Sequence, residues 1–143
     1  MKTVHAEQNW KGFFSYLDGY ETAEQYIEVE FSMKIIFSGE SFVGTFSSSE
    51  SKHVFDEPPK VKGFVEDGKI SFILKYPFSY FKDENGKFHT DKTTTHPEVH
   101  YLGFFNEDKS MVEGNWEMVK FLDQSLNDYT EEIFNGTVEM RRS

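Results

Sequence analysis

The sequence predicts an all-β protein, a single domain over residues 1–143 that folds as a closed antiparallel up-and-down barrel of about eight to ten strands, with one short helix before the last strand. Three observations carry this prediction. Long segments alternate apolar and polar residues with a period of two, a strong hairpin signal lies near the middle of the chain, and glycines recur inside the predicted strands. A two-layer sandwich is the alternative, and the succession of hairpins without long crossovers favours the barrel.

The central hairpin is predicted over residues 60–76, with its turn at Asp67-Gly68. An Asp-Gly pair between two alternating segments is a strong hairpin signal because both turn residues must adopt positive φ. A two-residue loop predicts four cross-strand pairs: Glu66 with Lys69, Val65 with Ile70, Gly63 with Phe72, and Val61 with Leu74. The last three pairs place apolar side chains and one glycine on a single face. A slip of one residue would turn that face outward, so pattern and turn agree on the register.

The other strands are predicted from the same alternation. The longest covers residues 26–37 and has six apolar side chains on one face: Ile27, Val29, Phe31, Met33, Ile35 and Phe37. Further strands are predicted over residues 9–17, 41–47, 98–105, 110–119 and 134–141. Residues 47–59 are expected to be mostly loop, with room for a short edge strand at 53–55. Asn85-Gly86 predicts a protruding hairpin within residues 77–97, with residues 93–95 at a flexible tip.

Residues 120–133 break the alternation. Leu122, Leu126, Tyr129 and Ile133 are spaced by four, three and four residues, which is typical of a short amphipathic helix. We expect this helix to plug one end of the barrel rather than to act as a lid.

Glycine positions support closure of the sheet. Four glycines fall in predicted turns: Gly19, Gly39, Gly68 and Gly86. The other six lie inside predicted strands, each followed two positions later by a larger residue on the same face: Gly12, Gly44, Gly63, Gly103, Gly114 and Gly136. Such glycines permit the sharp bends that a closed barrel requires. We therefore expect the first strand, from Trp10, to pair with the last, which ends near Arg141.

Charge and composition restrict the classes of partner. The net charge of −10 argues against nucleic acid and anionic membranes, because both require a basic surface. The sequence has no cysteine, which excludes disulfides and thiol chemistry. Residues 1–10 lack the apolar segment of a signal peptide, and no run of about 18 apolar residues is present. We expect a soluble, cytoplasmic protein, although a signal removed beforehand would leave no trace in this sequence.

Several motifs together resemble a known group of barrels. In chain order they are Trp10-x-Gly12-x-Phe14, residues 63–76, Tyr101-x-Gly103, Gly114-x-Trp116 and Gly136-x-Val138-x-Met140. This order resembles small single-domain barrels of the calycin type, which include lipocalins, avidins and fatty-acid-binding proteins, and above all their uncharacterised members. The resemblance implies a binding barrel, and a similar barrel attached to some F-box proteins serves in partner recognition.

The resemblance implies the fold without a specific ligand. Lipocalins carry Gly-x-Trp on their first strand, where this chain has Trp10-x-Gly12. The paired arginine and tyrosine that hold a fatty-acid carboxylate cannot be assigned, because the only arginines are Arg141 and Arg142. No avidin-like set of polar biotin contacts can be placed either.

The barrel interior is the predicted ligand site. Eight aromatic residues are expected to converge on it: Trp10, Phe14, Tyr16, Phe31, Phe72, Tyr76, Tyr101 and Trp116. Tyr and Trp combine flat apolar surface with one polar group, which suits a small-ligand pocket. The same rings can instead fill the interior by packing on one another, since a barrel of eight strands has room for either arrangement.

A second, weaker candidate is a metal site. The imidazoles of His89, His96 and His100 lie near two carboxylates, Asp91 and Glu98, and such groups bind Zn²⁺ or Fe²⁺. Their spacing matches no recognised ligand motif, and Pro97 interrupts any regular strand. We therefore expect a solvated loop here, with no metal and no other cofactor.

No catalytic residue is predicted. Glu28 and Glu30 share the outward face of their strand, and Glu131-Glu132 falls on the predicted helix, so neither pair has a reason to be buried. Nucleophile-elbow, zinc-protease and phosphate-loop motifs are absent from the sequence. We expect a non-catalytic scaffold that binds a small apolar or aromatic ligand. The alternatives are a protein-interaction module that uses its long loops and acidic surface and, with least support, a metal-dependent barrel enzyme.

Overall fold

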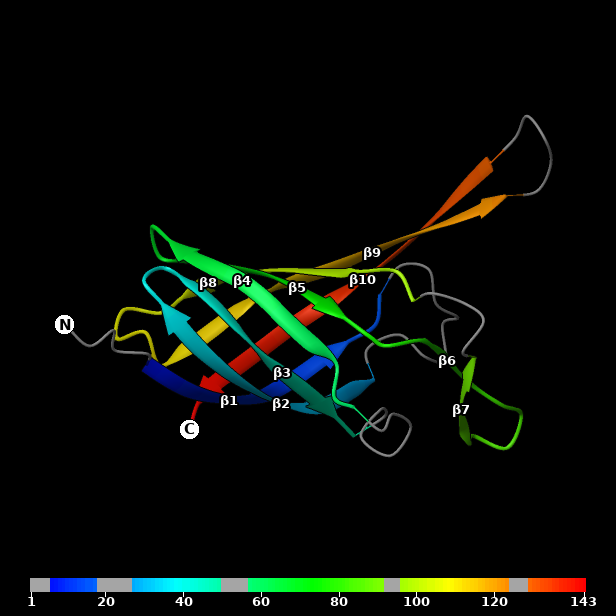
Figure 1. Cartoon of the computed structure of the whole chain (residues 1–143), viewed down its shortest axis with the longest axis horizontal. Coiled ribbons are helices and arrows are strands. Elements are labelled where there is room, and N and C mark those ends of the chain that lie inside the picture. The colour runs from blue at the N-terminus through cyan, green and yellow to red at the C-terminus, as the bar shows by residue number, and fades with distance from the viewer. Residues whose placement is uncertain (1–5, 18–26, 50–56, 92–95, 124–128) are drawn as a thin grey trace.

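The computed structural model describes residues 6–17, 27–49, 57–91, 96–123 and 129–143 (Figure 1). Within these residues the chain forms strands only: β1 (Ala6–Ser15), β2 (Glu28–Ser38), β3 (Ser41–Ser48), β4 (Lys60–Glu66), β5 (Lys69–Lys75), β6 (Ser79–Lys82), β7 (Phe88–Asp91), β8 (Val99–Phe105), β9 (Met111–Asp123) and β10 (Tyr129–Arg142). The predicted edge strand at 53–55 and tip at 93–95 lie outside the described residues, as does Gly19.

Eight of the strands form a closed antiparallel barrel in the order β1-β10-β9-β8-β5-β4-β3-β2. Each strand pairs with its neighbour along the chain, except that β6 and β7 form a separate two-stranded sheet between β5 and β8. The ends of the sheet meet where β1 pairs with β10, from Trp10 opposite Arg142 to Phe14 opposite Val138. The predicted closure is therefore confirmed, and the up-and-down topology is that of calycin-like barrels.

The central hairpin has the predicted register. All four predicted pairs, from Glu66–Lys69 to Val61–Leu74, occur between β4 and β5. Asp67 and Gly68 occupy the turn with φ of 50° and 77°, as a two-residue hairpin loop requires. The Asn85-Gly86 hairpin is also confirmed, as the turn between β6 and β7.

The period-two alternation sorts side chains between the interior and the surface. On β2, Val29, Phe31, Met33 and Ile35 are buried, whereas the residues between them are exposed. Ile27, predicted on the same inward face, is 49% exposed because it precedes the first residue of β2. The inward residues of all eight barrel strands together form one apolar core.

The predicted helix over residues 120–133 is wrong. Residues 111–123 belong to β9 and residues 129–142 to β10, and the two strands pair continuously from Met111–Arg141 to Asp123–Tyr129. Figure 1 shows this long hairpin extending beyond the rest of the barrel. Cross-strand pairing therefore overrides the local helical spacing, and the described part of the chain offers no helical plug for the barrel. Nor does that part contain a helix long and apolar enough to span a membrane.

The seam between the last and first strands is closely packed around Gly136. A β-carbon on this residue would overlap the Ser15 carbonyl oxygen and the Trp116 indole nitrogen. The Trp116 indole N–H donates a hydrogen bond of 2.9 Å to the same carbonyl, so β9 is linked to the end of β1 across β10. The hydroxyls of Ser15 and Thr137 share a further hydrogen bond at this seam.

Candidate functional site

The eight predicted interior aromatics all face the core. Seven are buried, and Tyr16 is partly buried and packs against them. They divide into two groups along the barrel axis. Trp10 packs edge-on against Phe105 at 6.0 Å, and its indole N–H donates to the Gln8 side chain. The other predicted rings lie in the middle and toward the opposite end of the barrel, so the eight do not line one common cavity.

Ring stacking fills the middle of the barrel. Phe31 stacks on Phe46 with centroids 5.0 Å apart, and Phe72 stacks on Tyr101 at 4.6 Å. Phe46 also contacts Phe14 and Tyr101, which makes it a central residue of the core. Phe46 is not among the eight predicted interior aromatics, although its inward position follows from the alternation of the strand predicted over residues 41–47. The rings in the middle of the barrel therefore pack on one another.

One end of the barrel leaves a small space, which we call the end pocket. It measures about 40 Å³ and is lined by Phe14, Tyr16, Tyr76, His96, Val99, Tyr101, Trp116 and Met118. Five of these are predicted interior aromatics. A water molecule needs about 10–15 Å³ of such volume, so the end pocket has room for about three waters.

Edge-to-face contacts and hydrogen bonds hold the walls of the end pocket. The Trp116 ring stands perpendicular to the rings of Phe14 and Tyr16, at 6.4 Å and 5.9 Å. The His96 ring lies 4.5 Å from the Tyr76 ring. His96 Nδ1 is 2.7 Å from the Pro97 carbonyl, which can only accept, so Nδ1 carries the proton in this contact.

Sequence reasoning missed the role of two lining residues. His96 was considered as a metal ligand, but it precedes β8 and lies against Tyr76 at the barrel end. Met118 was not considered, although it follows Trp116 by two positions and so shares its inward face. Period-two spacing was the available signal for Met118.

The three histidines of the weak metal candidate occupy separate places. His89, on β7, lies 2.7 Å from the Asp83 carboxylate, and His96 lies in the end pocket. His100 is exposed on the outer face of β8, which begins at Val99, one residue after the start of the strand predicted over 98–105. Within the residues that the structure describes, no three His, Cys, Asp or Glu side chains are grouped so that they could hold a metal ion.

The charged side chains that the structure describes lie on the surface. Glu28 and Glu30 are exposed on β2, as expected, and the side chains of Glu131 and Glu132 are outside the described set. Among described residues, the only buried polar side chains are Ser15 and Ser48. The polar side chains that line the end pocket are those of Tyr16, Tyr76, Tyr101, His96 and Trp116.

In comparisons with known proteins, no family model matches the chain and no curated protein matches it significantly.

Proposed function

We propose that this protein is a non-catalytic barrel of the calycin group that binds a small aromatic ligand in the end pocket. One observation carries the proposal: five aromatic rings from distant parts of the chain converge there around unfilled space, whereas rings stack on one another in the middle of the barrel. Assignment to the calycin group is supported by the eight-stranded up-and-down order and its closure between β1 and β10.

The side chains that line the end pocket favour a ligand with one aromatic ring and one polar substituent. Edge-to-face contacts with Phe14 and Trp116 would each contribute about 0.5–1.5 kcal/mol beyond area burial. A hydroxyl or ring nitrogen on the ligand would lie beside the polar side chains of Tyr76, Tyr101 and His96. Phenols, indoles and similar heteroaromatics therefore fit best.

The end pocket is too small for an aromatic ligand unless one of its side chains moves. An apolar cavity of about 150 Å³ accommodates benzene, whereas the end pocket measures about 40 Å³. Tyr16 is the least buried of the five aromatic wall residues and directly follows the last residue of β1. We infer that rotation of Tyr16 admits the ligand.

The two tryptophans allow a direct test by NMR. Phenol and indole are titrated into the ¹⁵N-labelled protein while both indole N–H signals are followed, assigned with Trp10→Phe and Trp116→Phe variants. We expect a saturable shift of the Trp116 signal and none of the Trp10 signal, because Trp10 lies at the opposite end. Equal movement of both signals, or no saturable shift of either, contradicts the proposal.

A matched pair of variants tests the gating residue. Tyr16→Ala enlarges the end pocket and should strengthen phenol binding about tenfold, because no ring has to be displaced. Phe105→Ala creates similar space at the other end, beside Trp10, and should leave the affinity unchanged. Equal effects of the two substitutions would mean that binding reflects general loosening of the barrel. The alternative of protein recognition through loops and acidic surface remains a prediction.

A further inference from the structure

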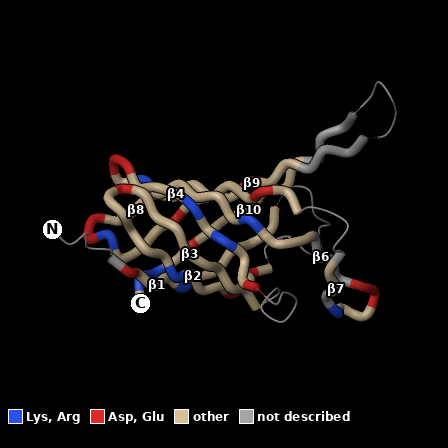
Figure 2. Tube along the Cα trace, viewed as in Figure 1, with Lys and Arg blue, Asp and Glu red and all other residues tan. Residues whose placement is uncertain are grey.

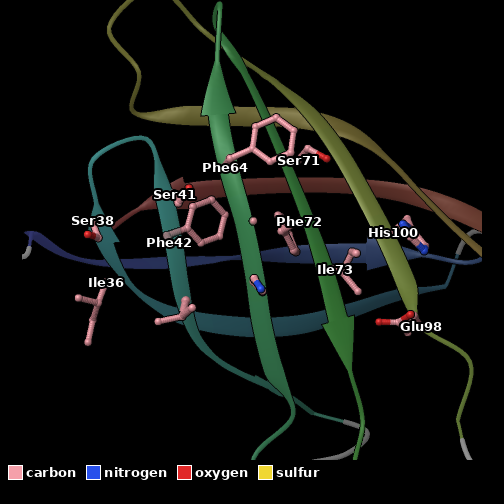
Figure 3. Close-up of a pocket in the computed structure, with 13 residues that line it drawn as sticks. Ile36, Ser38, Ser41, Phe42, Phe64, Ser71, Phe72, Ile73, Glu98 and His100 are labelled. Carbon is pink, nitrogen blue, oxygen red and sulfur yellow. The ribbon is translucent and has the colours of Figure 1, made fainter.

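A groove of about 580 Å³ lies on the outer face of the barrel, across β2, β3, β4, β5 and the start of β8 (Figure 3). Its walls expose apolar side chains to solvent: Ile36 is 39% exposed, Val43 55% and Phe64 48%. The groove is separate from the end pocket, because its exposed residues point outward from the strands. Exposed apolar side chains gathered in one place are typical of an interaction surface.

The strand register aligns these side chains in rows. Ile36 lies opposite Val43, Val43 opposite Lys62, and Lys62 opposite Ile73. In the next row Phe64 lies opposite Ser71, and Figure 3 shows the two side chains next to each other. The inward rings of Phe42 and Phe72 also line the groove, beside Gly63.

A row of lysines borders the apolar rows. Cross-strand pairing aligns Lys34, Thr45, Lys60 and Lys75 on the outer face, and Lys62 lies inside the groove. Lys60 stands directly opposite Lys75, a like-charge pair that is unfavourable in the isolated sheet. Lys34 forms an ion pair of 3.1 Å with Glu7. In Figure 2 blue segments cross β4 and its neighbours, whereas red segments gather at the turns.

Carboxylates lie on another part of the outer face. Glu113 on β9 lies opposite Glu139 on β10, and Glu139 lies opposite Phe13 on β1, which in turn lies opposite Glu30. Because the whole chain has a net charge of −10, a basic partner would be attracted to that side. The lysine row is suited to carboxylates. Glu98 and His100 line the β8 side of the groove, beyond Ile73 and Lys75, so the acidic residues of an occupant belong over Lys60 and Lys62.

The dimensions suit a helix. The rows cross four strands spaced about 4.8 Å apart, a span of about 14 Å. An α-helix advances about 5.4 Å per turn, so between two and three turns cover the groove. An amphipathic helix can place apolar side chains on Phe64 and its neighbours and carboxylates along its adjacent edge.

We propose that this groove docks an acidic amphipathic helix of a partner protein, with Ile36, Val43, Phe64 and Ile73 contacting its apolar face and Lys34, Lys60, Lys62 and Lys75 contacting its carboxylates.

Three capped peptides of about 14 residues serve as probes. All carry Leu and Phe at i, i+3, i+4 and i+7 spacing, flanked by Glu in the first, Gln in the second and Lys in the third. Fluorescence anisotropy should give saturable binding of the Glu peptide at least tenfold tighter than of the Gln peptide, weakening as salt is raised. The Lys peptide should be weakest at this site. NMR shifts should cluster at the amides of Val43, Phe64 and Ile73 and spare the Trp116 indole, which separates this site from the end pocket.

Matched variants locate the contact. Lys62→Glu should weaken the Glu peptide at least tenfold, whereas Lys109→Glu, the same charge change in the β8–β9 turn, should change it less than twofold. Phe64→Ser should also weaken binding of the Glu peptide at least tenfold. Phe104→Ser changes a comparably exposed ring outside the groove and should leave this binding unchanged. Circular dichroism verifies that all four variants fold.

Several outcomes would overturn the proposal. Preference for the Lys peptide, shifts clustered around Glu113 and Glu139, or equal effects of the paired variants would place binding elsewhere. Concentration-dependent self-association in sedimentation experiments that Lys62→Glu abolishes would identify a second copy of this chain as the occupant instead.

Discussion

Substitution of Gly136 by alanine tests whether the barrel depends on its closing seam. The added β-carbon would overlap the Ser15 carbonyl oxygen, which is backbone and cannot rotate away, and the indole nitrogen of Trp116. The β10–β1 seam or the Trp116 ring must therefore shift. Either movement breaks the buried hydrogen bond from Trp116 to Ser15.

The expected cost has two parts. Overpacking of a closely packed site costs about 1–3 kcal/mol. Loss of the buried indole hydrogen bond, which leaves a polar group unpaired, costs about another 1–3 kcal/mol. Together they predict a loss of about 4 kcal/mol in the free energy of unfolding. A small protein has only about 5–15 kcal/mol in total, so the Gly136→Ala variant should be close to unfolding at elevated temperature.

Urea denaturation followed by circular dichroism measures this loss. With a denaturant slope of about 2 kcal/mol per molar, the midpoint should fall by about 2 M. Gly68→Ala is the control: its φ of 77° makes alanine strained, but no atom lies near the added carbon, so the cost should be about 1 kcal/mol. In a cycle with Trp116→Phe, the two seam substitutions should cost less together than separately, since both remove the same hydrogen bond. A Gly136→Ala variant as stable as Gly68→Ala would mean that the seam has room for a β-carbon and does not depend on this glycine.

Further predictions concern the core and the β6–β7 hairpin. Phe46→Ala should lower the free energy of unfolding, measured by urea denaturation, by about 3–5 kcal/mol, because the ring is 1% exposed and contacts three other rings. Phe64→Ala, whose ring is 48% exposed, should lower it by less than about 1 kcal/mol. Similar losses in the two variants would contradict the assignment of Phe46 to the core. The pKa of the Asp83 carboxyl lies below its ordinary 3.8, because it accepts hydrogen bonds from the His89 ring and from the Lys87 and Asn85 amides. The depressed pKa means that this contribution to the hairpin is present above pH 3.8 and is lost as the pH falls through the folded-state pKa. In ¹³C NMR titrations, His89→Ala should raise the titration midpoint of the Asp83 carboxyl. The midpoint of Asp108 should stay the same, since Ser110 is the main cause of the lowered Asp108 pKa. A constant Asp83 midpoint would exclude the His89 contact.

Local sequence patterns predicted strand pairing correctly where two signals agreed. Alternation and the Asp67-Gly68 turn both predicted one register for the β4–β5 hairpin, and that register is observed. The pairing of the first and last strands was inferred from glycines inside the strands, and it is observed between Trp10 and Arg142. In each case a wrong arrangement would expose the apolar face or crowd the backbone, so the alternatives were few.

Local sequence patterns predicted the wrong structure where the contacts that determine it come from residues on another strand. Leu122, Tyr129 and Ile133 have helical spacing, yet residues 120–123 and 129–133 pair across the β9–β10 hairpin. The hydrogen bonds of that ladder join residues whose partners cannot be read from either segment alone. Similarly, the sequence identified inward aromatics but not which of them touch, so it could not separate Trp10 from the five rings of the end pocket.

From the residue pattern alone, most inward-facing side chains, the turns at Asp67-Gly68 and Asn85-Gly86, and the closure of the sheet could be predicted, because these features depend on period-two alternation and on the backbone freedom of glycine. The folded structure was needed to show that rings stack on one another in the middle of the barrel, that free space remains at one end, and that lysines and apolar residues share an outer groove. The reason is physical: a cavity or a surface row is formed by side chains from several strands, and its volume and charge depend on how curvature and register bring those strands together.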